Sequence, residues 1–138
     1  SIYYGSEWGI EGRKEGGNDD PLRPALNLAE MEEKYKDCQL TEHIRMLGRL
    51  KKELSPLSEG KYRELLLTNR QYAFARIQDD KAVIVAVNND ENPAHVSIPV
   101  PAGGNAVNAV TGEPVNVENG RINAELSPAG SLIVSVNI

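Results

Sequence analysis

Between residues 40 and 54 the apolar side chains recur every three or four positions. These positions are Leu40, Ile44, Leu47, Leu50 and Leu54. Such spacing places them on one face of an α-helix, and Pro56 then stops the helix because the residue before a proline is pushed out of helical geometry. Each buried Leu or Ile contributes about 1.5–3 kcal/mol. The pattern therefore predicts an amphipathic helix whose apolar stripe needs a partner surface.

From about residue 61 the period of the pattern changes from helical spacing to two. Residues 81–88 are apolar on both faces, which is typical of a central strand between two covered layers, whereas residues 96–100 and 121–126 alternate between apolar and polar. Asn119-Gly120 is the best local signal for a two-residue hairpin turn. Turn signals recur every 8–12 residues, so we expect a mainly β fold, with a Greek-key-like antiparallel β-sandwich of seven or eight strands over residues 59–138.

The first 38 residues follow neither period. A short apolar segment at residues 2–4, which we interpret as a strand beginning at Ser1, precedes a long polar stretch rich in Gly and Pro. Loops of this length are usually functional or disordered. A strand at the first residue would need earlier chain to pair with, so we expect the sequence to be the end of a longer protein.

Composition narrows the classes of partner. A net charge of -5 argues against nucleic acid, and no run approaches the roughly 18 apolar residues of a membrane helix. The single cysteine, Cys38, cannot form an internal disulfide, and His43 and His95 are too few for a His-rich metal site. We expect no metal site and no cofactor in this chain, and the cellular compartment is left open.

Several segments, in order, resemble the α-amylase family of glycoside hydrolases, especially its neopullulanase and cyclomaltodextrinase branch. SIYYGSEWGIEG at residues 1–12 is similar to the segment around the eighth strand of the catalytic barrel. DPLRP at residues 20–24 resembles the acidic and arginine loop after that strand, and residues 40–54 resemble the last barrel helix. YAFAR, AVIVAVNN and LSPAG, at residues 72–76, 82–89 and 126–130, resemble strands of the C-terminal sandwich.

The resemblance implies a domain division and an activity. Residues 1–58 would be the remnant of the last strand-helix unit of a (β/α)8 barrel, and residues 59–138 the C-terminal sandwich. The parent would be a retaining α-glucan hydrolase or transglycosylase acting on α-1,4 or α-1,6 bonds. In the family the catalytic carboxylates follow the fourth, fifth and seventh barrel strands, all of which would precede Ser1. We therefore expect no catalytic residue here and no activity from this chain alone; calcium in the parent stays open.

Asp20 and Arg23 are the first substrate-binding candidates that the resemblance implies. By the family pattern they would contact glucose hydroxyls, since a carboxylate and a forked guanidinium can fix a sugar's orientation. The family usually has two residues between Pro and Arg, whereas only Leu22 separates Pro21 from Arg23, so Asp19 is an alternative match for the acid. In another interpretation, Asp20 and Arg23 pin the loop together.

Glu7 and Trp8 are the other two candidates. Glu7 follows the expected end of the strand, where a buried, hydrogen-bonded carboxylate would support the site rather than touch the sugar. Trp8 could stack on a sugar face, or it could be a packing residue beside the barrel rim.

Two other classes of function stand beside the enzyme fragment. One is a stand-alone carbohydrate-binding sandwich, which the low aromatic content of 5% and the expected core position of Tyr72 and Phe74 disfavour. The other is a protein-interaction module that docks through the apolar stripe of residues 40–54. The expected partners are an α-glucan, for the parent enzyme, and the barrel portion of the same protein; self-association through the stripe is the alternative.

Overall fold

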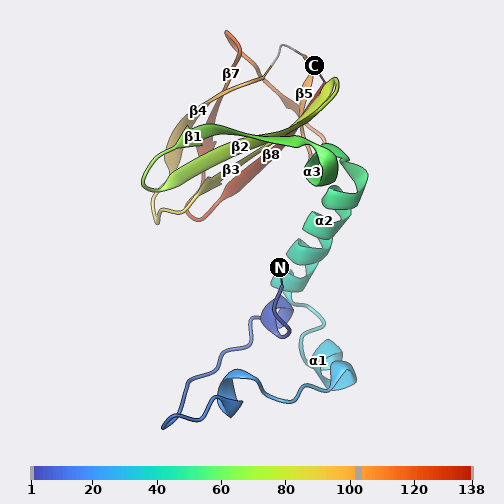
Figure 1. Ribbon diagram of the computed structural model, residues 1–138, viewed down its shortest axis with the longest axis vertical. Helices are drawn as coiled ribbons and strands as arrows, with labels where there is room; N and C mark the ends of the chain where they lie inside the picture. Colours follow the sequence, from blue (N-terminus) through green and yellow to red (C-terminus); the bar gives the residue numbers. More distant parts are fainter. Residues whose placement is uncertain (1, 102–103, 138) are drawn as a thin grey trace. The chain divides into compact units, whose positions relative to one another are not determined.

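The computed structural model of this chain describes residues 2–101 and 104–137 (Figure 1). Its contacts divide the chain into two compact units, residues 1–49 and residues 50–138. Each unit is described by itself. In the described part of the chain, no helix combines the length and apolar character needed to cross a membrane.

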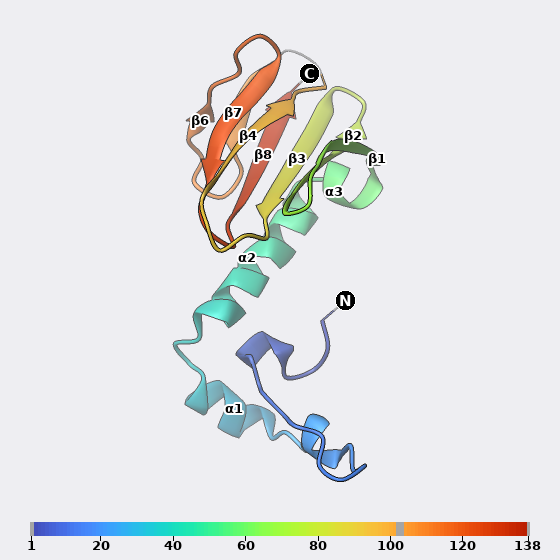
Figure 2. The ribbon, with the colours of Figure 1, turned by 90° about the vertical axis from the view of Figure 1, so that its left-hand side faces the viewer.

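The second unit is an antiparallel β-sandwich. The larger sheet has the strand order β1-β2-β3-β8-β5-β6 and the smaller sheet pairs β4 with β7; Figure 2 shows β4 and β7 lying over β3 and β8. The strands are β1 (Lys61–Leu67), β2 (Gln71–Gln78), β3 (Lys81–Asn88), β4 (Ala94–Pro99), β5 (Ala106–Asn108), β6 (Pro114–Val115), β7 (Arg121–Leu126) and β8 (Ser131–Asn137). The mainly β sandwich predicted from the period-two pattern is confirmed.

The core lies between the two sheets and follows from the alternation along each strand. Ile98 of β4 and Ile122 of β7 are directly opposite each other, and both are fully buried against the larger sheet. From that sheet β3 contributes Ile84 and β8 contributes Val134 to the same cluster. Side chains at every second position therefore fill one shared apolar layer, which is the main stabilising contact of the unit.

Strand β3 is apolar on both faces because it is the central strand of the larger sheet. It pairs with β2 along one edge and with β8 along the other. Ala82, Ile84 and Ala86 face the sandwich core, whereas Val83, Val85 and Val87 alternate with them and lie on the outer face. The predicted central strand is confirmed.

Strand β2 corrects one expectation about the aromatic residues. Tyr72 and Phe74 were expected in the core, but Ala73 and Ala75 are the fully buried members of β2 in the core cluster. Since side chains alternate along a strand, the two rings lie on the outer face of the larger sheet. The small alanines occupy the inner face.

The predicted turn at residues 119–120 is present. Asn119 and Gly120 both have positive φ, 51° and 72°, as a type I′ turn requires. The backbone N–H groups of Glu118 and Arg121 donate to each other's carbonyl oxygens at 2.9 Å. The hairpin extends no further, because β6 belongs to the larger sheet and β7 to the smaller one.

Asn88 joins two loops at one end of the sandwich. Its side chain is buried and donates from Nδ2 to the carbonyl oxygens of Asn92 at 2.9 Å and Ser127 at 3.0 Å. Its Oδ1 accepts from Nε2 of Gln71 at 2.9 Å. Within the first loop, hydrogen bonds from the backbone and side chain of Asn92 lower the pKa of Asp90. Residues 88–92 thus form a closed, hydrogen-bonded loop.

The first unit contains short helices and turns. Their bounds are η1 (Ser6–Trp8), η2 (Asp20–Leu22), α1 (Leu28–Lys34) and α2 (Gln39–Glu53), of which α2 continues into the second unit and is followed there by α3 (Pro56–Glu59). Helix α2 confirms the helix predicted over residues 40–54. Its positions Leu40 and Leu47 are 43% and 39% exposed, so much of the predicted apolar stripe is open to solvent.

Two expectations for the first 38 residues are wrong. Residues 2–4 form no strand, and Ser1 lies outside the described residues. A strand needs a neighbour to pair its backbone groups, and residues 2–49 contain only the isolated bridge between Glu15 and Asn18. The stretch read as continuous loop also contains α1, whose first turn is capped by Asn27 Oδ1, accepting from the N–H groups of Ala29 and Glu30.

Candidate functional site

Asp20 and Arg23 lie at the two ends of one short turn. Pro21 occupies the second position of η2, where its fixed φ suits the helical geometry, and the N–H of Arg23 donates to the carbonyl oxygen of Asp20 at 2.9 Å. Asn18 supports the start of the turn, since its Oδ1 accepts from the N–H of Asp20 at 3.0 Å. Both Asp20 and Arg23 are exposed, so a carboxylate and a guanidinium are presented to solvent from the same turn.

The ion pairs of the described residues do not join Asp20 to Arg23. The loop is held instead by the backbone bond within η2 and by a nearby pair, in which Nζ of Lys14 lies 2.9 Å from Oδ1 of Asp19. Asp19, the alternative match for the family acid, therefore already has a cationic partner. Of the two acids, Asp20 is the more exposed one.

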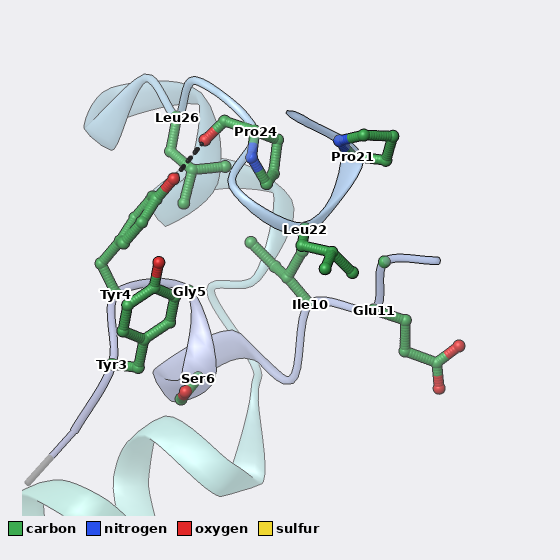
Figure 3. A pocket seen from close by; sticks show the side chains of 11 residues that line it. Tyr3, Tyr4, Gly5, Ser6, Ile10, Glu11, Pro21, Leu22, Pro24 and Leu26 are labelled. Carbon is green, nitrogen blue, oxygen red and sulfur yellow. Dashed lines mark hydrogen bonds between the residues drawn. The ribbon is translucent and has the colours of Figure 1, made fainter. Parts of the chain in front are cut away.

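The turn rests on a small apolar cluster within the first unit. Tyr3, Tyr4, Ile10, Leu22 and Leu26 line a cavity of about 70 Å³. Figure 3 shows these side chains, with the Glu11 side chain directed away from them. The hydroxyl of Tyr4 donates to the carbonyl oxygen of Pro24 at 2.9 Å. Pro21 and Leu22 line this cavity, but Asp20 and Arg23 do not. The cluster therefore fixes the middle of the turn and leaves its charged ends outside.

Gly12 allows the backbone to pass closely beside this turn, which gives a testable prediction. A Cβ at residue 12 would lie 2.3 Å from the carbonyl oxygen of Pro21. We expect Gly12→Ala to displace η2, and hence to shift the amide resonances of residues 20–23 in a ¹H–¹⁵N correlation spectrum. Gly48→Ala in α2 is the matched control, because a Cβ there meets nothing within 4 Å. Unchanged resonances in Gly12→Ala would contradict this packing.

Glu7 and Trp8 lie in a different part of the unit, in η1. They line a groove of about 420 Å³ together with Leu28 of α1, Tyr35 just after α1, and Arg45 of α2. The carbonyl oxygen of Glu7 accepts from Oγ1 of Thr41 at 2.6 Å, which attaches η1 to the first turn of α2. Oε2 of Glu7 is buried and has no hydrogen-bond partner within the described residues. The hydrogen bonds expected for a buried Glu7 carboxylate are therefore not formed at this oxygen.

The ring of Trp8 is engaged with another aromatic ring. It stacks on Tyr35 at a centroid distance of 6.3 Å and an interplanar angle of 25°. Nζ of Lys34 lies 5.1 Å from the centroid of the Tyr35 ring. One face of Trp8 is therefore used in packing, which favours a structural contribution from this residue over sugar stacking.

Cys38 and Thr41 form a small polar contact at the start of α2. Hydrogen bonds from the side chain and backbone of Thr41 lower the pKa of the Cys38 thiol. Its Sγ also lies 3.9 Å from the carbonyl oxygen of Glu7. Among the residues that the structure describes, no group of three or more His, Cys, Asp or Glu side chains is placed to hold a metal ion.

The sandwich matches a known protein family. Residues 62–135 match the family described as neopullulanase-like, C-terminal domain. The chain belongs to this family. It thus carries the C-terminal domain found in α-amylase family enzymes.

Similarity to known proteins covers almost the whole chain, and these proteins are several times longer than it. Neopullulanase 2 of Thermoactinomyces vulgaris is 31% identical over 137 residues, which cover 96% of this chain and 22% of that protein. A solved cyclomaltodextrinase has a TM-score of 0.80 at 23% identity, covering 99% of this chain and 23% of its own. An Anoxybacillus α-amylase has a TM-score of 0.79 at 22% identity, with coverage of 98% and 28%. At these identities the two structures show the shared fold. The chain spans 22% of the length of the curated relative.

The four site candidates thus lie in two separate places. Glu7 and Trp8 line one groove, and Asp20 and Arg23 lie on the η2 turn. Sequence reasoning missed the residues that hold these pairs in place, namely Tyr4, Thr41 and Tyr35. The contacts formed by these three residues join positions 20–34 residues apart, so no local spacing signals them.

Proposed function

We propose that this chain is the C-terminal portion of a retaining α-glucan hydrolase or transglycosylase, acting on α-1,4 or α-1,6 glucosidic bonds. The observation that carries the proposal is the match of residues 62–135 to the neopullulanase-like C-terminal domain. The similarity to neopullulanase 2 supports it further, because that similarity covers 96% of this chain and so includes the first unit as well as the sandwich.

In this proposal the reacting carboxylates belong to chain outside the present sequence. A retaining mechanism needs one carboxylate to attack the anomeric carbon and one carboxylic acid to protonate the leaving oxygen, with the two groups about 5–5.5 Å apart on a rigid scaffold. The loop acids Glu11, Glu15 and Asp20 are exposed, and Asp19 is paired with Lys14. Such exposed loop acids suit positioning of a substrate better than reaction with it, because the reacting pair must be held on a rigid scaffold.

The contribution proposed for the first unit is orientation of the glucan. Arg23 can donate in a forked geometry to neighbouring sugar hydroxyls, and Asp20 can accept from them, since η2 presents both groups at one site. At their separate groove, Glu7 and Trp8 would hold η1 in place through the contacts of these two residues with Thr41 and Tyr35. The division into a barrel remnant at residues 1–58 and a sandwich at residues 59–138 is part of the same proposal.

The proposal predicts an activity difference between this chain and its parent. The pure 138-residue chain is expected to show no turnover of maltodextrin, pullulan or cyclodextrin, whereas the longer protein that contains it hydrolyses at least one of them. Reducing-sugar release measures both. In the longer protein, Arg23→Ala is expected to lower kcat/KM roughly 10- to 100-fold, the loss of one or two hydrogen bonds to a charged group.

The matched control is Arg63→Ala, which removes an exposed arginine from the edge strand β1 and is expected to leave kcat/KM unchanged. Turnover by the 138-residue chain itself would overturn the assignment of the catalytic groups. Equal kcat/KM values for Arg23→Ala and Arg63→Ala would overturn the orientation assigned to Arg23.

A further inference from the structure

The turn at Asn119 and Gly120 brings a side-chain amide and an unhindered backbone nitrogen together at the surface. Asn119 is the only asparagine of this sequence that a glycine follows. Both residues of the turn are exposed, and a Cβ at residue 120 would meet nothing within 4 Å. The N–H group of Gly120 is therefore open to water, and no side chain on its own residue hinders the approach of the Asn119 amide.

The two groups are not engaged with other parts of the chain. Within residues 2–101 and 104–137, neither the side-chain amide of Asn119 nor the backbone N–H of Gly120 forms a hydrogen bond. Other asparagine amides are held in place: Nδ2 of Asn116 donates to Oε1 of Glu118 at 2.7 Å, and Nδ2 of Asn88 donates to two carbonyl oxygens. The amide carbon of Asn119 is thus the one most accessible to its neighbouring nitrogen.

The turn can open while both sheets stay folded. Glu118 and Arg121 form an isolated bridge, and beyond it the two arms of the turn enter different sheets. The carbonyl oxygen of Gly120 accepts from the N–H of Val100 at 2.8 Å, which attaches the turn to the end of β4. Local openings that break so few bonds need much less free energy than global unfolding. Asn119 therefore reaches other backbone conformations within the native state.

We propose that Asn119 is a site of spontaneous deamidation and isomerisation. The nitrogen of Gly120 loses its proton to solvent and attacks the side-chain carbonyl carbon of Asn119. The bond from that carbon to the amide nitrogen breaks, the nitrogen takes up a proton and leaves as ammonia, and a cyclic succinimide forms. Water then opens the ring at either carbonyl, giving aspartate or isoaspartate. One water is consumed and one ammonia is released, and the site does not depend on the proposed function.

The two products differ in their effect on the sandwich. Aspartate keeps the main chain intact and adds one negative charge beside Glu118. Isoaspartate routes the main chain through the former side chain, which adds one CH2 group between residues 119 and 120. The longer turn no longer matches the reciprocal hydrogen bonds of Glu118 and Arg121 at 2.9 Å. Because Ile122 of the core follows Arg121, isoaspartate weakens the pairing of β7 with β4.

Peptide mapping of the folded 138-residue chain tests this site. The chain is incubated in mildly alkaline buffer well below its melting temperature, and its peptides are analysed by mass spectrometry with fragmentation that distinguishes aspartate from isoaspartate. We expect a mass gain of about 1 Da at residue 119, at least fivefold more abundant than at any other asparagine. Asn116, which is exposed in the same loop but followed by valine, is the internal control.

Two substitutions at this position are the matched variants. Asn119→Gly removes the reacting amide and suits the positive φ of 51°, so the modification should disappear while the melting temperature stays close to that of the unmodified chain. Asn119→Asp reproduces the charge of one product with the main chain intact. The isoaspartyl form, separated by chromatography and identified with an isoaspartyl methyltransferase, is expected to melt several degrees below Asn119→Asp.

Every result supports or overturns the inference. Equal conversion at residues 116 and 119, or no conversion at residue 119 after prolonged incubation, overturns the site. Conversion at residue 119 that occurs only at urea concentrations that unfold the sandwich overturns its reaction in the native protein. Equal melting temperatures for the isoaspartyl form and Asn119→Asp overturn the effect assigned to the longer turn.

Discussion

Replacing Ile122 with alanine is expected to lower the free energy of unfolding of the sandwich by about 2–5 kcal/mol, the usual range for deleting a buried isoleucine. Ile122 is fully buried, lies opposite Ile98 and packs in the cluster that includes Ile84 of the other sheet. Neither flanking sheet can close the resulting cavity without shifting its strand register. In urea unfolding of the 138-residue chain, the midpoint should fall by roughly 1–3 M for a small domain.

Asn123→Ala is the matched control for this prediction. Asn123 is the next residue of β7 and points to the polar outer face, where its side chain accepts a hydrogen bond from Ser97. We expect it to change the unfolding free energy by less than about 1 kcal/mol. If the two variants unfolded at the same urea concentration, the assignment of Ile122 to the core would be wrong.

The second large effect is expected at Asn88. Asn88→Ala removes three hydrogen bonds at a buried position and leaves Nε2 of Gln71 and the carbonyl oxygens of Asn92 and Ser127 to find other partners. Each unsatisfied buried group costs about 1–3 kcal/mol, and water entering from the loop side offsets part of this, so we expect a loss of about 3 kcal/mol. Amide hydrogen exchange should become faster in both loops, residues 88–92 and 127–130.

Asn89→Ala separates this effect from a general sensitivity of the loop. The side chain of Asn89 is exposed, and its contact with Arg70 is made by the backbone N–H, which alanine retains. Its unfolding free energy should therefore be close to that of the unmodified chain. Exchange rates in residues 127–130 that were unaffected by Asn88→Ala would show that Asn88 does not join the two loops.

The sandwich was predictable from the sequence where burial is regular. Period-two alternation identifies β4 and β7, and the continuous apolar run identifies β3 as central, since only a strand paired on both edges and covered on both faces would carry it. Asn119-Gly120 was predictable because its turn needs two residues with positive φ. The strand order was not predictable, because the pairing of β3 with β8 joins residues about fifty positions apart through no local signal.

The first unit was less predictable, because its elements depend on contacts between distant residues rather than on a regular spacing of apolar side chains. Residues 2–4 look like a strand by composition, yet they have no strand beside them to complete their hydrogen bonds. Helix α1 has seven residues, which is too short to show a helical period. The face that Tyr72 and Phe74 occupy was misjudged because either face of a strand in the larger sheet can be apolar.

The four candidate residues from the family resemblance lie on short turns rather than on a strand of the first unit. The residues suggested by the family resemblance lie on turns held by Tyr4, Thr41 and Tyr35, which suits groups that orient a substrate for chemistry supplied elsewhere. The sandwich itself belongs to the neopullulanase-like C-terminal domain family.

The mass of the native polypeptide tests this central claim most directly. An antibody raised against the 138-residue chain should capture, from the cells that produce it, one polypeptide whose intact mass is several times the 15.1 kDa of this sequence. Its peptides should include a preceding barrel domain. A captured polypeptide of about 15 kDa, complete in itself, would contradict the account.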